Sequence, residues 1–143
     1  MLMGEFHHNI DEKGRLIIPA KFRNDLGDNF IVTRGIDSCL FVYPLAEWNN
    51  VTQKLREISF TKKDARNFGR FFLSGAQYVT VDKQGRILMP QDLREFAGLE
   101  KDVVLAGMGG RIEIWSLEKW NENSGQVDIN KISEGMINLG LTI

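Results

Sequence analysis

A nine-residue segment that occurs twice is the strongest constraint on how this chain can fold. Residues 11–19 and 82–90 both read Asp, two variable residues, Gly, Arg, three apolar residues and Pro. Further positions agree between the two copies, namely Arg23 with Arg94, Gly27 with Gly98 and Trp48 with Trp120. A repeat of this kind indicates two copies of one supersecondary unit, each expected to bury its apolar face against the other.

Each copy begins with the chemistry of a tight turn between two strands. Asp11 and Asp82 take the first position, where the side chain can accept hydrogen bonds from backbone amides two residues on. Gly14 and Gly85 take the fourth position, where glycine adopts a positive φ at little steric cost. Alternating or apolar segments flank both turns, so the sequence predicts a hairpin with a type I turn and a glycine bulge in each copy.

The rest of each copy predicts a short helix and a second pair of strands. The helices open at Pro19 and Pro90 and close at Gly27 and Gly98. Apolar strands follow at 31–34 and 39–43 in the first copy and at 103–106 and 111–115 in the second. Apolar residues at helical spacing predict further helices between the copies and after the second one.

The predicted fold class is α+β, mainly β, with two tandem units packed on each other about a pseudo-twofold axis. Each unit of about 45 residues is too small to hold a good core alone. The expected boundaries are 5–47 for the first unit, 48–75 for a helical linker, 76–119 for the second unit and 120–143 for a C-terminal helical tail. The tail is expected to dock either on its own chain or on a neighbouring subunit.

Composition argues against several classes of protein. The net charge of −1 shows that the chain as a whole is not a basic nucleic-acid coat. Cys39 is the single cysteine, and its apolar strand makes it a core residue; an intrachain disulfide is excluded and a reduced compartment is natural. No apolar run approaches the ~20 residues that span a membrane, and the first residues lack the pattern of a signal peptide. We therefore expect a cytoplasmic protein with no membrane partner.

No set of residues predicts a catalytic site, a metal centre or a cofactor. Glu5, His7 and His8 come nearest to a metal site, but strand alternation places the two histidines on opposite faces. Asp11 and Asp82 could be imagined as paired carboxylates, yet each already has a role in its turn. We predict a protein that is not an enzyme and takes no small-molecule substrate.

The arginines are the strongest functional candidates. Arg15 and Arg86 follow the bulge glycine in each copy, and Lys13 and Lys83 lie in or beside the turns. If the copies pair about a pseudo-twofold axis, these cations meet on one surface. A two-stranded ribbon fits the major groove of DNA, where Arg can bind a phosphate or the edge of guanine. The residues leave a second interpretation equally open, in which each Arg pairs with the Asp four residues before it and only holds the hairpin.

Both copies resemble a known family of DNA-binding units. The Asp-x-x-x-Arg pattern of Asp11 to Arg15 and of Asp82 to Arg86, followed by apolar residues and Pro, is similar to the core of the SpoVT/AbrB-type swapped-hairpin domain. Two such copies joined by 61–66 and a Phe-rich helix resemble the MraZ family over nearly the whole chain. The resemblance implies two tandem SpoVT/AbrB-like swapped-hairpin units packed as a pseudo-twofold β-barrel, with helices around it.

The resemblance also implies a function. The MraZ family comprises bacterial transcriptional regulators of the division and cell-wall gene cluster, which bind short direct repeats upstream of that operon and of their own gene within it. They assemble into ring-like homo-oligomers. The DNA-contacting motif of the family maps onto Asp11 and Arg15, and onto Asp82 and Arg86. The expectation is a nucleoid-associated regulator that binds double-stranded promoter DNA.

Two alternatives belong to other classes. An antitoxin-like protein of the same fold would bind DNA and also a toxin partner, although such proteins usually carry one hairpin unit and a long disordered tail. A metal-dependent enzyme would use Glu5, His7 and His8.

Overall fold

The structure is a computed structural model that describes residues 1–142, so that the last residue of the expected tail, Ile143, lies outside the described part. Unit 1 contains β1 (Glu5–Asn9), β2 (Arg15–Ile17), α1 (Ala20–Leu26), β3 (Asn29–Arg34), the 3-10 helix η1 (Ile36–Ser38) and β4 (Leu40–Pro44). Unit 2 contains β5 (Gln77–Thr80), β6 (Arg86–Leu88), α4 (Gln91–Ala97), β7 (Asp102–Gly107) and β8 (Ile112–Ser116). The other helices are α2 (Leu45–Glu57) and α3 (Lys63–Ser74) between the units, and α5 (Leu117–Gly125) and α6 (Ile129–Asn138) after unit 2.

Strands of the two units pair with each other throughout this mixed α+β fold. The larger sheet has the order β1-β7-β8-β4-β3-β5, and β2 and β6 form a separate two-stranded ribbon. Strand β1 of unit 1 therefore pairs with β7 of unit 2, and β5 of unit 2 pairs with β3 of unit 1. The order reads the same from either end when equivalent strands of the units are exchanged, which is the pseudo-twofold relation expected from the repeat.

The predicted hairpins are only half correct, because the turns form but the strands on either side of them separate. In unit 1 a single isolated bridge, Ile10 to Leu16, joins the two arms, while β1 continues along β7 and β2 along β6. Alternation of apolar residues specifies that a segment is a strand but does not specify its partner. The exchange gives each arm an apolar neighbour from the other unit, as a small unit without a core of its own requires.

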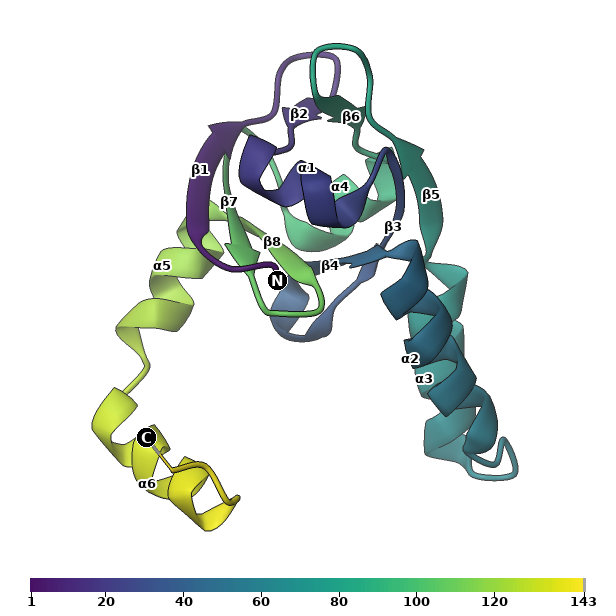
Figure 1. Cartoon of the computed structure of the whole chain (residues 1–143), viewed down its shortest axis with the longest axis vertical. Coiled ribbons are helices and arrows are strands. Elements are labelled where there is room, and N and C mark those ends of the chain that lie inside the picture. Colours follow the sequence, from purple (N-terminus) through teal and green to yellow (C-terminus); the bar gives the residue numbers. More distant parts are fainter. Residues whose placement is uncertain (143) are drawn as a thin grey trace.

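The sheet and the ribbon do not join into the closed barrel that the family resemblance implied. The six-stranded sheet ends at β1 and β5, and the ribbon stands apart from it. Helices α1 and α4 lie between the ribbon and the sheet (Figure 1), and their side chains Phe22 and Leu93 belong to the same buried cluster as Leu16 of the ribbon. The two helices thus fill the space between the ribbon and the sheet, where pairing between ribbon and sheet strands would have closed a barrel.

Two apolar clusters lie on the two faces of the large sheet. The first joins the ribbon, α1, α4 and one sheet face, and includes Leu16, Ile87 and Phe22, each at most 1% exposed. The second covers the other face with residues such as Phe41 and Trp115. Both clusters draw on both units, so neither unit has a core of its own.

Helix α3 connects the units as the sequence predicted. Phe72 packs against Tyr43 and Trp48 on the unit 1 side, with ring centroids 6.1 and 5.3 Å away. Its neighbour Phe71 packs edge-on against Phe96 of α4 in unit 2, at 5.6 Å between centroids. Helices α2 and α3 form a hairpin that projects away from the ribbon (Figure 1).

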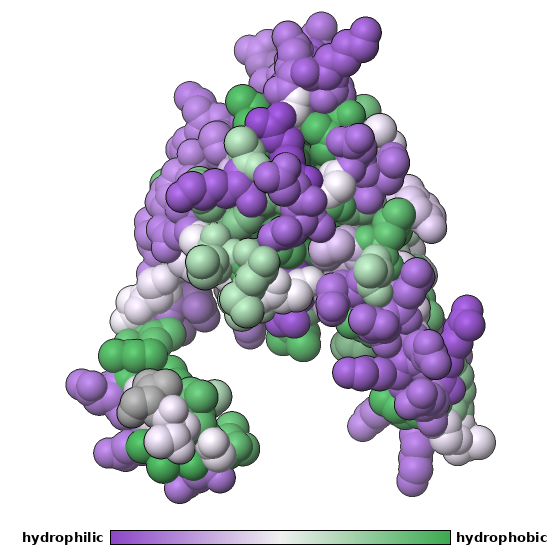
Figure 2. Space-filling model, viewed as in Figure 1, coloured by the Kyte–Doolittle hydropathy of each residue, from purple (hydrophilic) through white to green (hydrophobic). Residues whose placement is uncertain are grey.

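The C-terminal helix α6 projects from the body on the opposite side from the α2–α3 hairpin (Figure 1). It has no buried residue, and Ile129, Ile132 and Met136 are all exposed. In Figure 2 this arm shows hydrophobic (green) patches among hydrophilic residues, whereas the apex formed by the two turns is hydrophilic. The tail was expected to dock either on its own chain or on a neighbouring subunit. Within residues 1–142 of this structure, α6 does not dock on its own chain.

Candidate nucleic-acid interface

The two Asp-x-x-Gly-Arg turns have the same backbone geometry. The amide of Gly14 donates to the carbonyl of Asp11 at 3.0 Å, and the amide of Asp11 donates to the carbonyl of Arg15 at 3.0 Å. The turn of unit 2 repeats both bonds at 3.0 and 2.8 Å. Gly14 and Gly85 have φ of 82° and 77°, in the left-handed region that favours glycine. The predicted turn chemistry is confirmed in both units.

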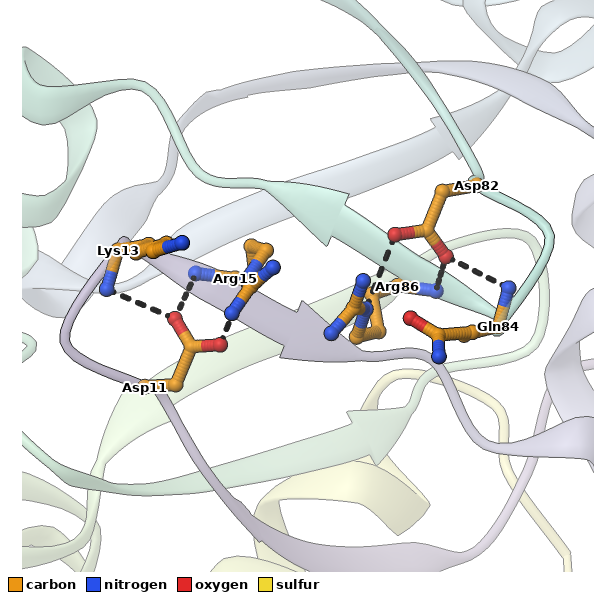
Figure 3. Close-up of polar contacts among 6 residues, drawn as sticks. All are labelled: Asp11, Lys13, Arg15, Asp82, Gln84 and Arg86. Carbon is orange, nitrogen blue, oxygen red and sulfur yellow. Dashed lines mark hydrogen bonds and ion pairs between the residues drawn. The ribbon is translucent and has the colours of Figure 1, made fainter.

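Each aspartate organises its turn through both carboxylate oxygens (Figure 3). Oδ1 of Asp11 accepts from the amides of Lys13 and Arg15, each at 2.9 Å, and Oδ2 accepts from Nε of Arg15 at 2.7 Å. Asp82 does the same with the amides of Gln84 and Arg86 at 2.9 Å and with Nε of Arg86 at 2.9 Å.

Hydrogen bonds to the aspartates also keep them ionised. The amide of Arg15 lowers the pKa of Asp11 below its usual value, and the amide of Arg86 lowers the pKa of Asp82 in the same way, because each bond favours the charged carboxylate. The guanidinium of the same arginine adds to each shift. Both turns therefore hold a carboxylate beside an arginine at neutral pH.

The ribbon brings both arginines to one surface. In its antiparallel register Arg15 lies opposite Leu88, and Ile17 lies opposite Arg86. The side chains of Leu16 and Ile87 are buried on the inner side of the ribbon, so alternation turns Arg15 and Arg86 to the outer side, where Figure 3 shows them between Asp11 and Asp82.

The two interpretations of the arginines are therefore compatible. Nε of each guanidinium binds its own aspartate, whereas within residues 1–142 the terminal nitrogens of Arg15 and Arg86 make no hydrogen bond to protein. The aspartate fixes the direction of the side chain and leaves the terminal donors of the planar fork unpaired in the described chain, with 32% of the Arg15 side chain and 24% of the Arg86 side chain exposed. Such a fork can bind a phosphate or the O6 and N7 atoms of guanine.

The lysines flank this surface unequally. Lys13 and Lys83 are both exposed on the turns at the apex of the molecule, where Figure 2 shows hydrophilic side chains. Lys13 has Gln84 as its equivalent, whereas Lys83 stands one position earlier in its turn. The two halves of the surface thus carry different side chains around identical arginines.

Two more arginines belong to this region, although the sequence alone predicted no role for them. A β-carbon placed on Gly14 would lie 3.0 Å from Nη1 of Arg94, and one placed on Gly85 would lie 2.5 Å from Nη1 of Arg23. Each arginine thus lies against the turn of the opposite unit. Nε of Arg94 is buried without a hydrogen-bond partner in the described chain. Arg23 and Arg94 occupy equivalent positions of the two copies, which was the one indication of a shared role in the sequence. This equivalence does not predict the strand exchange that brings each arginine to the opposite turn.

The other candidate residues do not form a site. Nε2 of His7 contacts Oε2 of Glu5 at 2.7 Å on the exposed edge strand β1. Across residues 1–142, no group of three or more His, Cys, Asp and Glu side chains is arranged to hold a metal ion. Burial raises the pKa of the Cys39 thiol to about 12, which removes it as a thiolate nucleophile at neutral pH. None of the described helices is both long and apolar enough to cross a membrane.

The fold and the surface define a tandem-repeat protein in which two units exchange strands and carry a duplicated Asp-x-x-x-Arg turn on a shared ribbon. A family model described as "MraZ protein, putative antitoxin-like" matches residues 1–71 and again residues 72–136. This chain belongs to the MraZ family.

Relatives of the chain agree in length as well as in sequence. A protein of Desulforamulus reducens is 55% identical over 141 residues, which is 97% of this chain and 99% of that protein. One of Thermoanaerobacter pseudethanolicus is 58% identical over 130 residues, 91% of each chain. One of Caldanaerobacter subterraneus subsp. tengcongensis is 54% identical over 143 residues, 99% of this chain and all of that protein. Each of these relatives is named transcriptional regulator MraZ.

Proposed function

We propose that this protein is a DNA-binding transcriptional regulator that places the outer face of the β2–β6 ribbon in the major groove of duplex DNA. The observation that carries the proposal is the pair Arg15 and Arg86, held on one face by their aspartates with their terminal nitrogens open. Lys13 and Lys83 on the adjoining turns would contact the phosphates. The names of the relatives support the same function.

The dimensions and charges of the ribbon favour duplex DNA. The major groove is about 12 Å wide and admits a two-stranded β-ribbon. The net charge of −1 is no obstacle, because the two turns that carry Lys13 and Lys83 lie side by side at one end of the molecule (Figure 1). Arg can distinguish guanine there, whereas the lysines contribute affinity that does not depend on sequence.

The biological setting follows from the family resemblance. The protein would act without catalysis in the cytoplasm, associated with the nucleoid, on the division and cell-wall gene cluster that includes its own gene. Its targets would be short direct repeats in the promoter. A ring-like homo-oligomer would engage several repeats at once, which raises affinity through effective concentration. The exposed apolar residues of α6 support contacts between subunits.

The test is binding to the DNA upstream of the protein's own gene. Arg15→Ala combined with Arg86→Ala removes both forks, and each is expected to weaken specific binding by roughly 5- to 150-fold, as removal of a bidentate hydrogen-bonding pair to guanine does. The matched control, Arg56→Ala combined with Arg70→Ala, removes the same charge from the exposed surface of the α2–α3 hairpin. Fluorescence anisotropy at several salt concentrations measures both, with circular dichroism as the check on folding.

The salt dependence of binding separates phosphate contacts from contacts to the bases. For the unmodified protein the logarithm of the binding constant should fall with the logarithm of salt, with a slope of about −0.9 for each phosphate contacted. Wild-type affinity in the Arg15/Arg86 variant at moderate salt, or an equal loss of affinity in the Arg56/Arg70 control, would contradict the proposal.

A further inference from the structure

Two aliphatic side chains are exposed on the same face of the ribbon as the arginines. Leu88 is 64% exposed and Ile17 is 45% exposed, whereas their neighbours Leu16 and Ile87 are at most 1% exposed. The outward positions of the two short strands are therefore Arg15, Ile17, Arg86 and Leu88, a set of two guanidinium groups and two aliphatic groups.

The register places each aliphatic side chain beside an arginine of the other unit. Arg15 is opposite Leu88, and Arg86 is opposite Ile17. The amide of Ile18 donates to the carbonyl of Gly85 at 2.9 Å, so the Arg–aliphatic pairs occupy the non-hydrogen-bonded positions of the ladder. Side chains are closest at such positions, with Cβ atoms about 5 Å apart. Each pair is a composite of both units.

The chemistry of these pairs matches the edge of base pairs better than the DNA backbone. A phosphate offers an aliphatic side chain nothing to bind, so Ile17 and Leu88 would be without a partner on a surface that held only phosphates. In the major groove, guanine offers two acceptors to Arg, and thymine offers a C5 methyl group to an apolar side chain. Within each ribbon strand both outward residues then have a partner on the bases.

We propose that Ile17 and Leu88 contact thymine methyl groups in the major groove, so that each Arg–aliphatic pair reads a guanine and a nearby thymine. This inference rests on the proposed function and adds the second base to it. The two aliphatic residues then determine specificity. Each Arg–aliphatic pair combines one residue from each unit, since Arg15 lies opposite Leu88 and Arg86 lies opposite Ile17.

The experiment compares two versions of one DNA probe. The fragment upstream of the protein's own gene is amplified with either thymidine or deoxyuridine triphosphate, because uracil pairs as thymine does but lacks the C5 methyl group. Removal of one methyl group from the interface should weaken binding about fourfold, and removal of two should weaken it roughly 15-fold. Ile17→Ala combined with Leu88→Ala should bind the thymine fragment weakly and bind both fragments equally.

Controls separate the methyl contact from other effects of uracil. Leu73→Ala removes an aliphatic side chain of similar exposure, 40%, from α3, and it should discriminate between the fragments as the unmodified protein does. Ile17→Val combined with Leu88→Met keeps apolar contact and should restore discrimination. The inference is overturned if the unmodified protein binds both fragments equally, or if the Ile17/Leu88 alanine variant still discriminates. Failure of the unmodified protein to bind the thymine fragment at all would instead overturn the proposed function.

Discussion

Leu16→Ala tests whether the exchanged ribbon holds the two units in one cooperative structure. Leu16 is completely buried, lies opposite Ile87 of unit 2 and shares a cluster with Phe22 and Leu93 of the flanking helices. Truncation of a buried leucine costs about 2–5 kcal/mol, because it removes transfer free energy and leaves a cavity. Domains have only about 5–15 kcal/mol of stability, so this cost is a large part of the total. At about 2–4 °C per kcal/mol, the Tm should fall by about 4–20 °C.

Tryptophan fluorescence during urea unfolding shows which unit is destabilised. Trp48 reports on α2 beside unit 1, and Trp115 reports on β8 of unit 2. Trp48→Phe leaves the reporters of unit 2, and Trp115→Phe combined with Trp120→Phe leaves the reporter beside unit 1. Each background is compared with its own parent with and without Leu16→Ala. Because every core cluster draws on both units, both reporters should show the same decrease in the free energy of unfolding.

The neighbouring residue provides the control for this prediction. Ile17→Ala truncates a branched aliphatic side chain of the same strand, as Leu16→Ala does. Because the Ile17 side chain is 45% exposed, the loss in free energy of unfolding should stay within about 0.5–1 kcal/mol. The reasoning is refuted if Leu16→Ala costs less than about 1 kcal/mol, or if one reporter shifts while the other keeps its parent's midpoint.

Three further predictions concern single positions. Gly107→Ala should cost about 1–3 kcal/mol in urea unfolding, because its β-carbon would overlap the backbone of Met3, whereas Gly125→Ala meets open space and should be neutral or stabilising. Because the folded pKa of Asp82 is lowered, its contribution to stability should be complete above its ordinary value of 3.8 and lost as the pH falls through the lower folded value. The stability difference from Asp82→Asn should therefore shrink on acidification, and a difference that grows would contradict the assignment. Cys39, with its pKa raised to about 12 by burial, should react with Ellman's reagent only after denaturation, so stoichiometric reaction of the native protein at neutral pH would be the contrary result.

Local chemistry predicted the turns and the short helices well. Asp11 and Gly14 act on amides and dihedral angles within residues 11–15, so five consecutive residues contain all the information required. The helix that Pro19 and Gly27 predicted forms as α1, and Phe22 and Leu26, one helical turn apart, are buried on one face of it. Such features depend on residues that are adjacent in sequence, so they can be predicted from the sequence alone.

Strand pairing could not be predicted in the same way, because it depends on neighbours in space. The arms beside each turn alternate correctly for strands, yet the same alternation fits a partner in either unit. The proximity of Arg94 to Gly14 follows from that exchange and was missed with it. The outward direction of Ile17 and Leu88 could have been recognised, since each is the middle residue of a three-residue apolar run beside an outward arginine. If a second copy of the chain supplies the docking site of α6, that site depends on contacts between subunits, which the order of elements along one chain does not specify.

If the ribbon binds DNA as proposed, its two unequal halves give the molecule a direction along the duplex. If the same ribbon were built from two identical chains, both halves of its surface would be equal, and either orientation on a duplex would have the same energy. Here both halves lie in one covalent chain, so the turn with Lys13 and the turn with Gln84 have been able to diverge around equal arginines. On DNA bound as proposed, one orientation on a given site would therefore be favoured over its reverse. Direct repeats are copies of a site in one orientation. A ribbon with two unequal halves would bind all of them in the same orientation, as the proposed direct repeats require.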